Sequence, residues 1–104
     1  MAGTSSRPDQ ELLEKTRQKN DEPPMYRVFL LNDDYTTMEF VIEILQDVFH
    51  KPTMEATQIM LHVHRNGRGL AGVYVRDIAE TKVETVKTMA RERGYPLQCA
   101  MEKA

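Results

Sequence analysis

Apolar and polar positions follow two different periodicities along this chain, and short polar or glycine-containing breaks separate them. Residues 25–31 form an apolar run rich in aromatic and β-branched side chains, which predicts a strand. From Val41 to Phe49, apolar residues recur at i, i+3, i+4, i+7 and i+8, which predicts a helix. The sequence His50-Lys51-Pro52 should end that helix.

The same two periodicities then repeat. Residues 56–64 carry apolar side chains at helical spacing, and Gly67 is the expected left-handed C-cap of this second helix. Residues 70–76 read as a second strand. A third helix should follow, with an inner stripe that ends before Gly94, and residues 97–102 should form a short last strand. The inner stripe comprises Ala79, Val83, Val86 and Ala90.

Each helix start has a candidate capping residue. Thr36 with Glu39 has the spacing of a capping box, and Asp77 with Glu80 forms a similar pair before the third helix. Thr53 could cap the second helix. The predicted order is therefore β-α-α-β-α-β, an α+β domain with helices packed on one small sheet.

The chain divides at a double proline. Residues 1–24 are polar and end in Asp-Glu-Pro-Pro, and they contain too little apolar surface to pack. They predict a flexible N-terminal extension, and composition alone also allows a mere solubilising leader. Residues 25–104 should form a single core domain.

Composition narrows the functional classes. The 104 residues include 14 basic and 16 acidic side chains, a net charge of −2, without a basic block, so nucleic-acid binding is not favoured. The one cysteine excludes an internal disulfide. Since the N-terminus has no apolar signal region and no apolar run approaches a membrane span, a cytoplasmic protein without membrane contact is expected.

The polar stretch between the first strand and first helix is the main candidate for chemistry. Asn32, Asp33 and Asp34 could form a solvated Asx-turn, or a binding or catalytic site held between two rigid elements. A general acid–base pair of Asp33 and Asp34 is disfavoured because adjacent side chains usually point apart. No phosphate-binding loop, G-x-S-x-G or H-E-x-x-H motif accompanies them.

Two histidines in the second helix invite a metal interpretation. On a helix, His62 and His64 lie about 200° apart, so their rings diverge, and no zinc-type ligand spacing is present. The sequence therefore predicts no metal site. His64 borders the apolar stripe, where it could be a boundary residue in water or a ligand contact beside Asn32 and Asp33.

Three separated motifs carry a resemblance to a known family: LLNDDYTTMEFV at 30–41, ATQIMLHVH at 56–64 and AETKV at 79–83. Together they resemble the ClpS family, adaptors that deliver substrates with destabilising N-terminal residues to a Clp-type AAA+ unfoldase and its protease. The likeness extends from about Pro24 to Lys103. Thr37 stands where many relatives have proline, and either residue is tolerated at a helix start.

The resemblance implies a monomeric, non-enzymatic adaptor without a cofactor, built on a three-stranded antiparallel sheet. In the family, the residues matching Asn32, Asp33 and His64 hold the free α-amino group of the substrate. An ammonium carries three donors, and two oxygen acceptors with a neutral imidazole would complement them. The N-terminal extension is implied to be the segment that the unfoldase engages during substrate transfer.

A pocket for N-terminal Leu, Phe, Tyr or Trp is also implied. Its wall would consist of the matching residues Thr36, Met38, Val41, Met60, Val63 and Leu97. Soft methionine side chains suit varied large apolar groups. A rigid Met38 near the ligand Cβ would reject β-branched Ile and Val by steric exclusion.

The third motif reads by itself as a capped helix start with exposed charges. In the family, residues matching Asp77, Glu80 and Lys82 help to dock the N-terminal domain of a ClpA- or ClpC-like unfoldase, and mixed charges suit a transient contact. Two other hypotheses remain: a non-enzymatic interaction module resembling the C-terminal domain of the ribosomal stalk protein, and a small hydrolase that uses Asp33 and His64.

Overall fold

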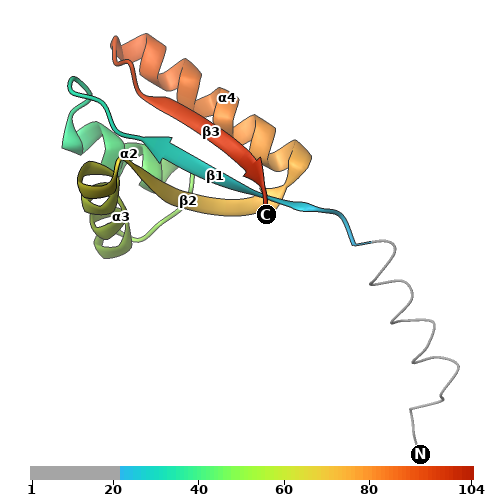
Figure 1. Cartoon of the computed structure of the whole chain (residues 1–104). Helices are drawn as coiled ribbons and strands as arrows, with labels where there is room; N and C mark the ends of the chain where they lie inside the picture. The colour runs from blue at the N-terminus through green and yellow to red at the C-terminus, as the bar shows by residue number, and fades with distance from the viewer. Residues whose placement is uncertain (1–21) are drawn as a thin grey trace, which may run out of the picture.

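The computed structural model describes residues 22–104, and these follow the predicted order β-α-α-β-α-β (Figure 1). The elements are β1 (Met25–Leu31), α2 (Met38–Asp47), α3 (Thr53–Asn66), β2 (Arg68–Val75), α4 (Arg76–Arg93) and β3 (Gln98–Lys103). The predicted α+β class is confirmed. The predicted extension lies outside the described residues except for positions 22–24, which are exposed and have no regular secondary structure.

The strand β1 lies at the centre of a three-stranded antiparallel sheet with the order β2-β1-β3. Its side chains explain this position, since Val28 and Leu30 are fully buried and Phe29 is 9% exposed. Val28 pairs with Gly72 on one side and Met101 on the other. A central strand is covered on both edges, which suits a nearly continuous apolar run.

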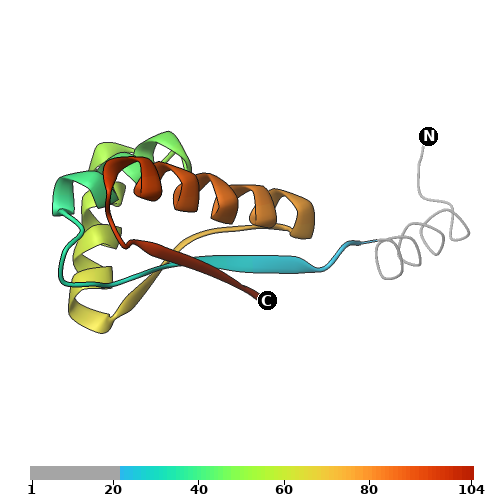
Figure 2. The ribbon, with the colours of Figure 1, turned by 90° about the horizontal axis from the view of Figure 1, so that it is seen from above.

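The helices bury their apolar stripes against one another and against the sheet. Figure 2 shows α4 lying along one side of the sheet, with α2 and α3 gathered near the end of β1. The predicted inner stripe of α4 is buried, as are Ile44 and Leu45 of α2. A Cβ at Gly69 would lie 2.6 Å from Val63 Cγ2, so this glycine allows α3 to approach β2 closely.

The helix ends match the prediction better than the helix starts do. Gly67 and Gly94 are left-handed C-caps with φ of 90° and 75°. However, the predicted N-caps are wrong at all three helices. Thr37, not Thr36, caps α2 by accepting a hydrogen bond from the Phe40 amide.

The other two helix starts have no side-chain cap. Pro52 occupies the N-cap position of α3 and Thr53 is already helical, while Val75 occupies that of α4 and Asp77 lies inside the first turn. Glu80 pairs instead with Arg76, at 3.2 Å.

Among the described residues, no helix is both long and apolar enough to cross a membrane.

Candidate functional site

A cavity of about 430 Å³ opens where the β1–α2 loop and the first turn of α2 meet the second half of α3. It brings together the predicted amino-group residues and all of the predicted apolar wall except Leu97. The predicted residues in its lining are Asn32, Asp33, Thr36, Met38, Val41, Met60, Val63 and His64.

Leu97 lies elsewhere. It is 5% exposed and belongs to the core, and it lines a different hollow between the C-terminal half of α4 and the start of β3. The structure therefore does not bring Leu97 to the same cavity surface as the other predicted wall residues.

Asp33 organises the polar side of the cavity through an Asx-turn. Its Oδ1 accepts hydrogen bonds from the amides of Tyr35 and Thr36 at 2.8 and 2.7 Å, and its Oδ2 accepts one from the Thr36 hydroxyl at 2.7 Å. The Asx-turn interpretation of the sequence is thus correct. It coexists with a place in the cavity lining, because Oδ2 accepts only one of these hydrogen bonds and retains a further lone pair for a ligand.

These contacts keep Asp33 ionised. Partial burial disfavours the charge, but the hydrogen bonds from Thr36 and Tyr35 outweigh it and lower the pKa of the carboxyl below its ordinary value of 3.8. A fixed anion therefore stands at the cavity at neutral pH.

Asn32 and His64 approach the cavity from two different elements. The Asn32 amide donates to the Gly67 carbonyl at 2.9 Å, which ties the end of β1 to the end of α3, where His64 lies. Both side chains are exposed, and within residues 22–104 neither makes a hydrogen bond. Their polar atoms are therefore available to a ligand.

The remaining lining separates into an apolar floor and an acidic rim. Val41, Met60 and Val63 are 8%, 6% and 3% exposed, whereas Met38 on the first turn of α2 is 48% exposed. Asp34, which the sequence analysis considered as part of a binding or catalytic site, and Glu39, which it considered only as a capping partner, also line the cavity. The sequence feature that could have indicated this position is the cluster of acidic residues around Asp33. Such a cluster favours a cationic ligand group.

The two histidines of α3 have different neighbours, since His64 lines the cavity and His62 does not. Both lie on the helix, and His62 Nδ1 is 3.1 Å from Asn66 Nδ2 one turn later. Across the described part of the chain, no group of three or more His, Cys, Asp or Glu side chains could hold a metal ion.

The residues that the resemblance assigns to docking lie on α4, outside the lining of the cavity. Asp77 and Glu80 are exposed, and Asp77 and Lys82 line a hollow of about 460 Å³ beside the half-exposed Ile78. The Lys82 ammonium is not free: it donates to the Val48 carbonyl at 2.6 Å, where it caps the end of α2.

The Asp33 turn should make stability depend on acidity. Because the folded pKa is lower than the ordinary 3.8, the contribution of this carboxylate should be fully present above that pH and lost as the pH falls through the lowered value. Urea denaturation across a pH series should show the difference in unfolding free energy between the wild type and Asp33→Asn shrinking in acid. A difference that does not change with pH would contradict this origin.

Comparisons with known proteins show the family to which the chain belongs. The family model "ATP-dependent Clp protease adaptor protein ClpS" matches residues 21–100. ATP-dependent Clp protease adapter proteins ClpS of Burkholderia cenocepacia and Burkholderia mallei are each 57% identical over 104 residues, 100% of both chains. The structure of Agrobacterium tumefaciens ClpS2 bound to L-phenylalaninamide is similar with a TM-score of 0.77 and 40% identity, covering 80% of this chain and 100% of that one.

Proposed function

Since this chain belongs to the ClpS family of ATP-dependent Clp protease adaptors, we propose that its cavity binds the N-terminal residue of N-degron substrates, those that begin with Leu, Phe, Tyr or Trp. The adaptor would then deliver them to a Clp-type unfoldase for proteolysis.

The observation that carries this proposal is the combination of a fixed carboxylate and an apolar floor in one cavity. Asp33 provides the charge that an α-ammonium needs, and Asn32 and His64 offer two further acceptors. Met60 and Val63 offer the surface against which an apolar side chain would pack. The L-phenylalaninamide bound to the Agrobacterium protein has the same two features, a free α-amino group and a large apolar side chain.

The cavity size is consistent with this class of ligand. About 430 Å³ falls at the lower end of the range of small-molecule sites, which suits one large side chain with its amino group rather than a longer segment. Met38 stands at the mouth, where it would contact the Cβ of the N-terminal residue.

The chain itself would bind without catalysing a reaction, and its partner would use the ATP. Both Asp33 oxygens are engaged in the turn, and no nucleophile is paired with His64 within residues 22–104, so a hydrolase built on Asp33 and His64 has little support. Titration with a Leu-initiated peptide tests the proposed binding, and peptide turnover by the purified chain would favour the hydrolase.

We infer that the partner is a ClpA- or ClpC-like unfoldase, which would dock on the first turns of α4. The exposed carboxylates of Asp77 and Glu80 and the half-exposed Ile78 provide a mixed charged and apolar surface there. Lys82 would contribute mainly by holding the end of α2 against this helix.

Charge reversal on this surface should separate docking from substrate binding. Asp77→Lys should weaken unfoldase binding roughly tenfold at low salt and leave affinity for a Leu-initiated peptide unchanged. Glu92→Lys, an equal charge change at the exposed far end of α4, is the matched control. If both reversals weaken unfoldase binding equally, the first turns of α4 are not the docking surface.

A further inference from the structure

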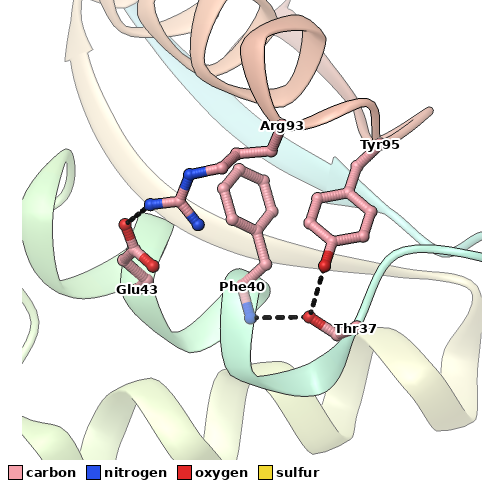
Figure 3. Close-up of polar contacts among 5 residues, drawn as sticks. All are labelled: Thr37, Phe40, Glu43, Arg93 and Tyr95. Atoms are coloured by element: carbon pink, nitrogen blue, oxygen red, sulfur yellow. Dashed lines mark hydrogen bonds and ion pairs between the residues drawn. The ribbon is translucent and has the colours of Figure 1, made fainter.

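The N-terminus of α2 is held by the C-terminal end of α4 (Figure 3). The Thr37 hydroxyl accepts a hydrogen bond from the Phe40 amide at 3.1 Å and donates towards the Tyr95 hydroxyl, 3.5 Å away. Tyr95 lies 58 residues further along the chain, directly after the glycine that ends α4. One hydroxyl thus caps α2 and connects it to a distant segment.

Three further contacts join the same elements. The Tyr95 and Phe40 rings have centroids 4.8 Å apart at an interplanar angle of 40°. The Arg93 guanidinium lies 5.3 Å from the centroid of the Phe40 ring and donates to Glu43 Oε2 at 2.7 Å. The end of α4 therefore contacts α2 at positions 37, 40 and 43, on successive turns (Figure 3).

The anchoring side of these contacts is itself fixed. The Tyr95 amide donates to the Ala90 carbonyl at 2.9 Å, and Gly94 adopts the left-handed conformation that this helix ending requires. Phe40 is 2% exposed and belongs to the core. Thr37, in contrast, is exposed and stands at a helix start, where backbone amides lack intrahelical partners.

Met38 follows Thr37 directly and is the first residue of α2. The Met38 side chain is 48% exposed, so neighbouring side chains pack against only part of it. The position of the first turn of α2 therefore determines where this side chain lies at the cavity mouth. Steric exclusion of a single methyl group requires that the excluding side chain is held in a fixed position.

We propose that Tyr95 and Arg93 are positioning residues for substrate selectivity. By holding Thr37 and Phe40, they fix the first turn of α2 and thereby determine how strictly Met38 excludes β-branched N-terminal residues. This inference rests on the proposed function of the cavity. Neither Tyr95 nor Arg93 lines that cavity, so their effect on the ligand acts through α2.

The test is Tyr95→Leu, which removes the hydroxyl and the ring contact but keeps an apolar side chain. We expect the Phe40 amide to exchange its hydrogen about fivefold faster, and the ratio of affinities for Leu- and Val-initiated peptides to fall by a similar factor. In a Met38→Ala background, Tyr95→Leu should leave that ratio unchanged, because the wall that it positions is already gone.

Arg93→Ala is a second variant, at an exposed position. It tests the same positioning role if the Tyr95→Leu variant does not fold. It should change amide exchange and selectivity in the same direction, whereas Arg91→Ala on the same helical turn should change neither.

A wild-type protein that binds no Leu-initiated peptide overturns the proposed function and this inference with it. Tight Leu binding in the wild type, with amide exchange and selectivity unaltered in both variants, overturns the positioning role alone.

Discussion

Asp33→Asn should weaken binding of a peptide with a free N-terminal Leu by about thirtyfold or more. The substitution removes the charge that faces the α-ammonium, and loss of one partner of a close charge pair costs about 2 kcal/mol or more. Asparagine keeps an oxygen in the position of Oδ1, which accepts the amides of Tyr35 and Thr36. The turn should therefore survive, and a reduced affinity would reflect the lost charge rather than a lost loop.

The neighbouring carboxylate supplies the control for this effect. Asp34→Asn makes the same chemical change at the cavity rim, but Asp34 accepts no hydrogen bond within residues 22–104. This substitution should therefore lower the affinity for the peptide only a few-fold. Calorimetric titration of both variants measures the difference. Equal losses would show that the cavity attracts cations generally and that Asp33 has no specific place in it.

Met38→Ala should admit peptides that begin with Ile or Val. Truncation removes the side chain at the cavity mouth, which is half exposed and contributes little to the core, so the domain should remain stable. The space that opens accommodates the second branch at Cβ. We expect affinity for Val-initiated peptides to rise tenfold or more, on the order of 1.4 kcal/mol, while Leu-initiated peptides bind with similar or slightly lower affinity.

A competition series across Leu, Phe, Ile and Val measures this change. Met54→Ala removes a methionine that is 76% exposed on the first turn of α3, outside the cavity lining, and should leave the order of affinities unchanged. Continued rejection of Ile and Val by Met38→Ala would show that another group excludes them.

The fold could be predicted because its determinants are local and periodic. The run around Val28 and the helical spacing around Ile44 each specify one element, and Gly67 and Gly94 mark ends that require a left-handed residue. Helix starts were harder, since Thr36 and Thr37 are chemically identical. Backbone geometry alone decides that Thr37 caps α2 while the Thr36 hydroxyl binds Asp33.

Contacts between distant segments were the part that the sequence did not reveal. Nothing in the local pattern indicates that Lys82 reaches the Val48 carbonyl, 34 positions away, or that Tyr95 meets Thr37. The direction of a side chain near the start of a strand is also not evident from the sequence. Leu97 therefore lines a different hollow from the one expected. Pairing across a fold depends on how elements pack, and periodicity does not specify that arrangement.

The proposal that the cavity recognises a free α-amino group can be tested most directly with two peptides that differ only at that group. A short Leu-initiated peptide and its N-acetylated twin carry the same side chain, but acetylation removes the positive charge and two of the three donors. Calorimetric titration of the wild-type chain should show binding of the free peptide and at least about thirtyfold weaker binding of the acetylated one. Equal affinities for the two peptides would contradict recognition of the amino group at Asn32, Asp33 and His64.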